Sequence, residues 1–522
     1  MNRIIILLFA LFPILGFGQS ARYARMFNFS NTIWESAYDI MELPDQDIIV
    51  VGNSSKCVGS SCDHAAGMAR TDTDGNLKWF TKLGTAGVNM TAMATCMGND
   101  GNLMFLAHYA GNMVLSKLDP SGNPLWHRMV SASGTFWPRS VVGYDNAYFV
   151  VGQIYDNVDR IAYICRIEEN GSFGWIKFFK IPGSNNEFHC IRVNGDGELV
   201  VAGAGINSDR IVGLTFFDPA GNITKTWGFK DTLEQSVPFV QDLVITSNGN
   251  YALSFRGRNN NSFCLMEVDK GGNLNWAKRY YHIPAPDEKV NVVENHFGGY
   301  LVMATRQFHT NQSSILSMRV DGNGNKVWGK VIDNLYEDRA HRLIQAHNCG
   351  YLLVSMSEGM GSAGWMIARA DSSGQIGIES GNPAIDQYNL PMTQDSFPVN
   401  PYAYSYNESE PTLIRDNPVV LMDSLFHYTA TPSCTSPVGS PDPQTEEWTI
   451  SPNPVHNFVK VTGLSPSHKL LPEYRVYDLQ GRVSQSGIMH SDKIDLSRLN
   501  AGIYIFEIEN QGRILRKRLV KH

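Results

Sequence analysis

Short runs of apolar residues, each bounded by turns rich in Gly and Asn, follow one another along most of the chain. The clearest runs are Ile48–Gly52, Leu103–Leu106, Tyr148–Gly152, Leu199–Gly203, Tyr251–Ser254, Tyr300–Met303 and Tyr351–Val354. Each has one more short apolar stretch before it and two after it, such as Tyr163–Ile167 and Trp276–Tyr280. Runs of this length between turn residues are typical of β-strands, so the pattern predicts units of four short strands.

One phrase recurs in every unit: an acidic residue, two spacers, Gly, usually Asn, and a Trp four residues after the Gly. Its glycines are Gly75, Gly122, Gly171, Gly221, Gly272, Gly324 and Gly374, which are 47, 49, 50, 51, 52 and 50 residues apart. The Trp of the fourth copy, Trp227, comes two residues late, and the seventh copy (Asp371 to Gln375) has no Trp. A repeat of this length with four strands predicts the blades of a propeller.

The chemistry of the phrase fits a tight turn. Gly tolerates the positive φ that such a turn needs, and the acidic side chain can accept backbone N–H bonds. The Trp offers a large apolar face to the next blade. We therefore predict an all-β fold with a seven-bladed β-propeller over residues 19–385. Residues 22–27 resemble the fourth strands of other units and are predicted to complete the seventh blade.

The N-terminus predicts export. Met1-Asn2-Arg3 is followed by an apolar run to Phe17 with Gly16 and Gly18 after its core, which is typical of a secretory signal peptide over residues 1–18. The alternative is a membrane anchor, but the run is shorter than the ~20 residues that span a bilayer. No later segment is long and apolar enough to cross a membrane.

Composition narrows the class of partner. Charged residues make up 18% of the chain and the net charge is −7, so nucleic acid, which requires a basic face, is excluded as the main partner. Of eight cysteines, Cys57 and Cys62 alone lie close together, and in an exported chain they can form a disulfide or remain two free thiols. Metal binding there is disfavoured because no CxxC pair or nearby His completes a tetrahedral set.

Beyond the repeats the composition changes. Pro, Ser, Asn and Thr accumulate over residues 386–447, an extension that ends in a linker at Thr431–Glu446. Residues 448–522 alternate apolar and polar positions, which predicts a small antiparallel β-sandwich.

This last segment closely resembles the type A C-terminal sorting domain of the type IX secretion system of Bacteroidetes-type bacteria. The matching residues are Pro452, Asn453, Pro454, Tyr477, Asp478, Gly481, Arg482, Asp495, Leu496, Gly502, Tyr504, Lys517 and Lys521. The resemblance implies passage through the periplasm, recognition by the outer-membrane translocon, and removal of the domain by a sorting peptidase. It further implies a protein that is secreted or attached to the cell surface.

The repeats resemble the Trp-bearing repeats of quinoprotein-type propellers over residues 21–385, and loosely those of sialidase-like propellers. The spacing of the phrase differs from the sialidase Asp-box, and the chain has no adjacent Cys-Cys pair as in quinoproteins.

Candidate chemistry is sparse, and we assign no catalytic, cofactor-binding or metal-binding residue. Asp72–Asn76 and Asp321–Asn325 place oxygen atoms at alternate positions as calcium loops do, but both lack a following Glu and coincide with the turn. His108, His127, His189, His309, His341 and His347 lie in different units. We favour a binding or adhesion module for glycan or protein. The alternative is a secreted hydrolase or lyase acting on a polysaccharide or glycoconjugate at the propeller mouth.

Overall fold

The computed structural model describes most of the repeat region and parts of the C-terminal segment. It describes residues 22–28, 35–58, 61–84, 89–180, 186–205, 211–231, 236–257, 262–281, 289–309, 312–332, 338–347, 350–357, 364–371, 374, 376, 379–380, 386–389, 392–395, 400–402, 406–409, 414–416, 421–428, 449–451, 455–462, 473–477, 483–489, 491–500, 502–510 and 513–521. The predicted signal peptide and the linker at Thr431–Glu446 lie outside the described residues.

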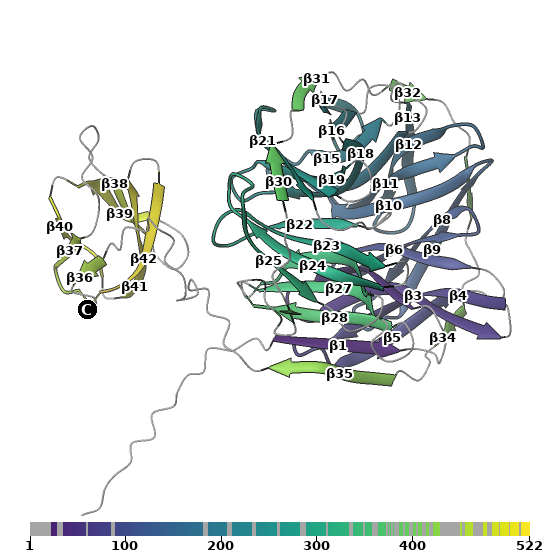
Figure 1. The fold of residues 1–522 in the computed structure, drawn as a ribbon, viewed down its shortest axis with the longest axis horizontal. Coiled ribbons are helices and arrows are strands. Elements are labelled where there is room, and N and C mark those ends of the chain that lie inside the picture. The colour runs from purple at the N-terminus through teal and green to yellow at the C-terminus, as the bar shows by residue number, and fades with distance from the viewer. Residues whose placement is uncertain are drawn as a thin grey trace, which may run out of the picture. The chain divides into compact units, whose positions relative to one another are not determined.

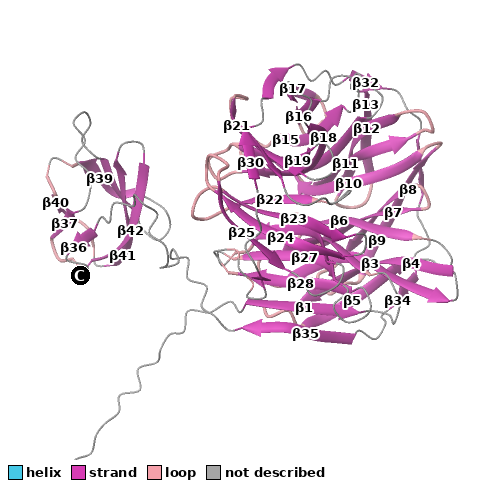
Figure 2. Cartoon of the chain, in the orientation of Figure 1, coloured by secondary structure: helices cyan, strands magenta, loops and turns pink. Residues whose placement is uncertain are grey.

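The repeats form seven antiparallel sheets arranged as the blades of a propeller (Figure 1), and every described element is a strand (Figure 2). Blade 1 holds β2 (Ser36–Glu42), β3 (Ile48–Val58), β4 (Ser61–Thr71) and β5 (Leu77–Gly84). Blade 2 holds β6 (Met90–Met97), β7 (Leu103–Tyr109), β8 (Asn112–Leu118) and β9 (Pro124–Ala132). Blade 3 holds β10 (Thr135–Tyr144), β11 (Ala147–Tyr155), β12 (Arg160–Glu168) and β13 (Phe173–Lys180).

The same order continues around the ring. Blade 4 holds β14 (Asn186–Val193), β15 (Leu199–Gly205), β16 (Ile211–Phe217) and β17 (Ile223–Asp231). Blade 5 holds β18 (Ser236–Ile245), β19 (Tyr251–Gly257), β20 (Ser262–Val268) and β21 (Leu274–Tyr281). Blade 6 holds β22 (Val290–Glu294), β23 (Tyr300–His309), β24 (Gln312–Val320) and β25 (Lys326–Ile332). The predicted all-β propeller is confirmed.

The two ends of the ring meet in blade 7. This blade holds β26 (Asp338–Gln345), β27 (Tyr351–Ser357) and β28 (Gly364–Ala370) from the last repeat, and its fourth strand is β1 (Arg22–Asn28). β1 pairs antiparallel with β28, with Tyr23 opposite Arg369 and Phe27 opposite Trp365. The predicted closure by residues 22–27 is confirmed.

Apolar side chains fill the space between neighbouring blades. Seven core clusters are each shared by two blades: Ile49, Met68, Phe105 and Val114 join blades 1 and 2, for example, and Ile40, Val50, Leu352 and Trp365 join blades 7 and 1. A blade alone would leave both of its faces exposed, so the ring is stabilised collectively.

A fifth strand lies at the outer edge of every blade. We call these seven strands the belt: β29 (Glu379–Ser380), β30 (Asp386–Asn389), β31 (Met392–Asp395), β32 (Asn400–Tyr402), β33 (Tyr406–Ser409), β34 (Ile414–Asp416) and β35 (Leu421–Tyr428). They pair with blades 6, 5, 4, 3, 2, 1 and 7 in that order, so the chain runs backwards around the ring. Figure 1 shows the last of them, β35, beside β1. The segment that we predicted as an extension thus covers the outer strand edges, which otherwise invite aggregation.

The repeated phrase forms one turn geometry throughout. In the first copy, Asp72 Oδ1 accepts the backbone N–H groups of Asp74 at 3.0 Å and Asn76 at 2.8 Å. Asn76 Nδ2 donates to the other oxygen of Asp72 at 2.9 Å. The glycine of each copy has a positive φ, and from the second copy onwards a Cβ there would meet the Trp of the preceding blade. Trp227 lies over Gly272 as Trp79 lies over Gly122, because a displacement by two residues keeps a side chain on the same face of a strand.

The C-terminal unit, residues 437–522, is a small β-sandwich. One sheet contains β36 (Thr449–Ser451), β37 (Phe458–Thr462) and β40 (Lys493–Asp495). The other contains β38 (Glu473–Tyr477), β39 (Val483–Ile488), β41 (Gly502–Asn510) and β42 (Arg513–Lys521). Val459, Val476, Ile494, Phe506 and Leu519 pack between the sheets, as the alternating pattern predicted.

The two cysteines that can form a disulfide lie in a long hairpin of blade 1. Cys57 in β3 is paired in backbone register with Cys62 in β4. Directly opposed residues of an antiparallel pair have Cα atoms within the separation that a disulfide can bridge. Their side chains lie outside the described residues, and the bond stays a prediction.

Candidate functional site

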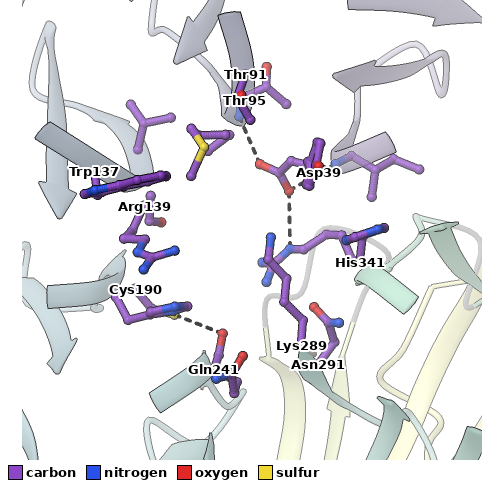
Figure 3. A pocket seen from close by; sticks show the side chains of 18 of the residues that line it. Asp39, Thr91, Thr95, Trp137, Arg139, Cys190, Gln241, Lys289, Asn291 and His341 are labelled. Atoms are coloured by element: carbon purple, nitrogen blue, oxygen red, sulfur yellow. Dashed lines mark hydrogen bonds and ion pairs between the residues drawn. The ribbon is translucent and has the colours of Figure 1, made fainter. Parts of the chain in front are cut away.

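A cavity of ≈ 330 Å³ lies where the innermost strands of the seven blades converge (Figure 3). Its walls come from β2, β6, β10, β14, β18, β22 and β26, and its lining includes Tyr38, Asp39, Trp137, Arg139, His189, Cys190, Arg192, Gln241, Lys289, Asn291, His341 and Arg342. Pockets of 300–1,000 Å³ are typical of small-ligand sites.

β-bulges set the lining. In six of the innermost strands the pairing register skips one residue, and those residues are Tyr38, Met93, Arg139, His189, Gln241 and His341. β22 has no such skip. A bulge leaves one residue out of the ladder and re-aims its side chain, here into the cavity. The β-bulge thus recurs in six of the seven innermost strands, while the side chain at the bulge differs from blade to blade.

Two carboxylates, the half-buried Asp39 and the fully buried Asp242, tie the inner strands together. Asp39 accepts the backbone N–H of Thr95 on blade 2 at 2.9 Å, and Asp242 accepts that of Val292 on blade 6 at 3.3 Å. Arg342 Nη1 donates to Asp242 at 2.7 Å, and Arg342 Nε lies 3.4 Å from Asp39. Arg192 donates to Asp242 at 2.9 Å. These carboxylates serve as acceptors within the ring itself.

The network fixes the charge of Arg342. Burial works against its protonated form, but Asp242 and Asp39 outweigh that effect and raise the pKa of Arg342. Asp242 is fully buried, and a buried charge needs partners. Arg192 and Arg342 are those partners. A buried carboxylate with two guanidinium partners is a rigid structural element rather than a free base.

Burial favours the neutral forms of the imidazoles and the thiol of the cavity. Burial lowers the pKa of His341 to about 3, with Lys289 and Arg339 adding to the effect. Burial, Arg139 and Lys289 lower the pKa of His189. Cys190 Sγ lies 3.8 Å from His189 Nδ1, but burial raises the pKa of the thiol to about 12, so it is no thiolate nucleophile at neutral pH.

An aromatic surface stands at the cavity rim. Trp137 is 38% exposed although it is one of the lining residues. Its indole stacks on the ring of His108, with centroids 4.5 Å apart and planes 6° from parallel. One face of the indole is therefore held by His108, which gives the rim a fixed orientation.

Of the histidines singled out in the sequence, the ring brings His189 and His341 to the cavity, and His108 supports Trp137. His127 and His347 lie elsewhere: His127 bonds Ser116 at 2.8 Å, and His347 bonds Glu42 at 2.8 Å. The side chain of His309 is outside the described part. Sequence reasoning missed Arg139, Lys289 and Arg342, although polar residues inside the first strand of each apolar unit were a usable signal.

The calcium-like loops are occupied by their own hydrogen bonds. Asp321 Oδ1 accepts from the backbone of Asn323 at 2.9 Å and of Asn325 at 2.7 Å, and Asp321 Oδ2 accepts from Asn325 Nδ2 at 2.9 Å. Within the described ranges, no three His, Cys, Asp or Glu side chains gather as metal ligands would. The turn geometry explains these residues.

The sorting-motif residues are partly described. Leu496 is buried, Asp495 accepts the backbone N–H of Ser497 at 2.8 Å, and Tyr504 donates to the carbonyl of Asn500 at 3.0 Å. Lys521 is also buried. Pro452, Asn453, Pro454, Asp478, Gly481 and Arg482 lie outside the described residues, as do the side chains of Tyr477 and Lys517.

These features define a propeller protein that carries a separate C-terminal export module. Residues 449–522 match the family described as the secretion system C-terminal sorting domain. The chain is therefore delivered by the type IX secretion system to the cell surface or the extracellular space, as the motifs predicted. None of the described residues forms a helix that could span a bilayer.

Several solved structures have a similar arrangement of strands. The extracellular domain of a one-component system of B. thetaiotaomicron has 10% identity and a TM-score of 0.36, over 96% of this chain and 59% of that one. A catalytically inactive virginiamycin B lyase of Staphylococcus aureus, solved with quinupristin, has 12% identity and a TM-score of 0.42, over 66% of this chain and 99% of that one. PorZ, a surface component of the type IX secretion system of Porphyromonas gingivalis, has 9% identity and a TM-score of 0.25, over 93% and 81%.

The chain thus spans about three fifths of the length of the extracellular domain that it matches. No curated protein matches the sequence.

Proposed function

We propose that the propeller is an extracellular binding module that takes a glycan into its central cavity. The observation that carries this proposal is the combination of an exposed, oriented indole at the rim with a wall of polar side chains below it. Saccharide rings offer an apolar face and a periphery of hydroxyl groups. An aromatic face beside fixed donors and acceptors is complementary to both.

The cavity is poorly equipped for hydrolysis. A glycoside hydrolase uses two carboxyl groups, one of which holds a transferable proton. Among the described residues, Asp39 is the one carboxylate in the lining; its oxygens accept the backbone N–H groups of Ile40 and Thr95, and one of them lies 3.4 Å from Arg342 Nε. Neither His189 nor His341 is bonded to a carboxylate in the part of the chain that the structure describes. This arrangement supports retention of a ligand over its conversion.

The test is a glycan and polysaccharide screen of the full chain that scores both retention and product release. We expect retention without product. Trp137→Ala should weaken binding at least tenfold, since it removes the stacking face. Tyr155→Ala is the matched control, because Tyr155 is also exposed, at 42%, and lies on the same blade outside the lining. Measured turnover, or equal binding by both variants, would overturn the proposal.

A further inference from the structure

Among the described residues, the lining of the cavity carries more positive than negative charge. Its lining holds Arg139, Arg192, Lys289 and Arg342 but one carboxylate, Asp39, with Asp242 buried behind it. Arg192 and Arg342 are paired with these two carboxylates. Of the other two cations, Arg139 lies 3.9 Å from Glu187, and Lys289 has no ion pair among the described residues.

We propose that the ligand is an acidic saccharide whose carboxylate or sulfate group binds between Arg139 and Lys289. This inference rests on the proposed function and specifies its ligand class. Figure 3 shows both side chains reaching into the same open space from different blades.

Lys289 lines the cavity without a counterion among the described residues. Among the described residues its ammonium group has no hydrogen bond or ion pair, and its one aromatic contact is the ring of Tyr38, 5.9 Å away. Burial lowers the pKa of Lys289, and Arg342 and Arg139 oppose its charge further while Asp39 favours it. An ammonium group without a counterion is costly to desolvate, and an anion beside it removes that cost.

Arg139 supplies the second cation, a guanidinium group with several N–H donors in one plane. Its guanidinium lies 3.9 Å from Glu187, too far for a hydrogen bond, and its buried Nε has no partner. Guanidinium groups bind planar oxyanions through two parallel N–H bonds. Arg139 is also the residue that the bulge of β10 leaves out of the ladder, so the backbone itself directs it inward.

Two buried polar atoms without partners belong to the same lining. Asn291 is 2% exposed, yet its Nδ2 has no hydrogen-bond partner, and His341 Nε2 is likewise buried and unpartnered. Both residues line the cavity. A buried donor without an acceptor is rare unless a ligand or water supplies one. With Trp137 at the rim, the site offers one aromatic face, two cations and at least one orphaned amide.

The experiment compares three oligosaccharides of equal length on the full chain by titration calorimetry: one containing uronic acids, one carrying sulfate esters, and one neutral. We expect at least one acidic ligand to bind tenfold or more tightly than the neutral one, with an affinity that falls as salt rises. The two acidic arms distinguish carboxylate from sulfate.

Lys289→Gln should remove most of the preference for the acidic ligand, and Lys289→Arg should retain it. Lys270→Gln is the control for charge, because Lys270 is exposed on the turn of Asp269 and outside the cavity. Thermal melting of each variant checks that it is folded. Acidic binding that is unaffected by Lys289→Gln would overturn the inference.

The acidic and neutral oligosaccharides distinguish glycan binding in general from a preference for acidic saccharides. If the neutral oligosaccharide binds as tightly as the acidic ones, the ligand class is wrong and glycan binding stands. If no saccharide binds, the proposed function fails with it.

Discussion

The ring of Tyr23 lies directly against Gly75, so that a Cβ on that glycine would fall 2.6 Å from Tyr23 Cε2. Tyr23 belongs to β1 of blade 7, and Gly75 belongs to the turn of blade 1. In the other interfaces a Trp of one blade covers the glycine of the next. Tyr23 therefore takes the place of the Trp that the seventh repeat lacks.

Replacing Tyr23 tests this closure. Tyr23 is fully buried, and we expect Tyr23→Ala to lower the free energy of unfolding by about 3–5 kcal/mol, the range for a buried aromatic residue. Urea unfolding monitored by Trp fluorescence measures it. Tyr155→Ala, at an exposed site, should stay within about 0.5 kcal/mol of the wild type. Equal effects of both substitutions would contradict the closure.

Substituting two turn glycines distinguishes the effect of backbone strain from the effect of packing against Trp. Gly272 has φ 92°, and a Cβ there would lie 2.7 Å from Trp227. Gly249 has φ 85° with nothing within 4 Å. We expect Gly272→Ala to lower the melting temperature clearly more than Gly249→Ala, since both bear the strain of a positive φ and one also displaces the Trp. Thermal melts of the two variants that coincide would show that the Trp contact is unimportant.

Truncation tests the belt. A chain ending at Ser436 keeps all seven belt strands, and a chain ending at Asp416 lacks β35 and leaves the outer edge of β1 unpaired. We expect the chain ending at Ser436 to have the same propeller melting temperature as the full chain. The chain ending at Asp416 should melt at a lower temperature and aggregate, because an open strand edge is a template for pairing. Calorimetry and light scattering measure the two effects. Identical behaviour would mean that β35 contributes nothing.

His341 makes the propeller sensitive to acid. The pKa of His341 is about 3 in the folded chain and about 6.5 in the unfolded chain. Between these two pH values the unfolded chain is protonated at His341 and the folded chain is not. Stability should therefore fall as the pH drops from about 6.5 towards 3. His341→Gln should lose less stability than the wild type between pH 7 and pH 4.5, as measured by urea midpoints. The same loss in both proteins would refute this role.

Much of the ring could be predicted because it repeats. The Gly recurs in all seven copies and the Trp in six, and the turn depends on local chemistry alone, as with Asp72 and Asn76. Residues 22–27 were recognisable because they resemble the other fourth strands. Local pattern and overall architecture agree at these positions.

The belt and the cavity could not be predicted for two different physical reasons. Belt strands such as β32 (Asn400–Tyr402) are too short to show an alternating pattern, and backbone pairing to a blade already formed defines them. The cavity uses residues of unrelated types at equivalent bulges, from Met93 to Arg139. A search for recurring residues cannot detect a position that recurs only in backbone geometry.

The placement of β1 between β28 and β35 also determines when the ring can close during synthesis. Residues 22–28 are made early, but their two neighbours, residues 364–370 and 421–428, are made after nearly all of the propeller. Contacts between such distant segments are slow to form, since a very long loop must close first. Ring completion is therefore a late step, and a chain interrupted during synthesis before residue 364 would leave its first strand without either partner.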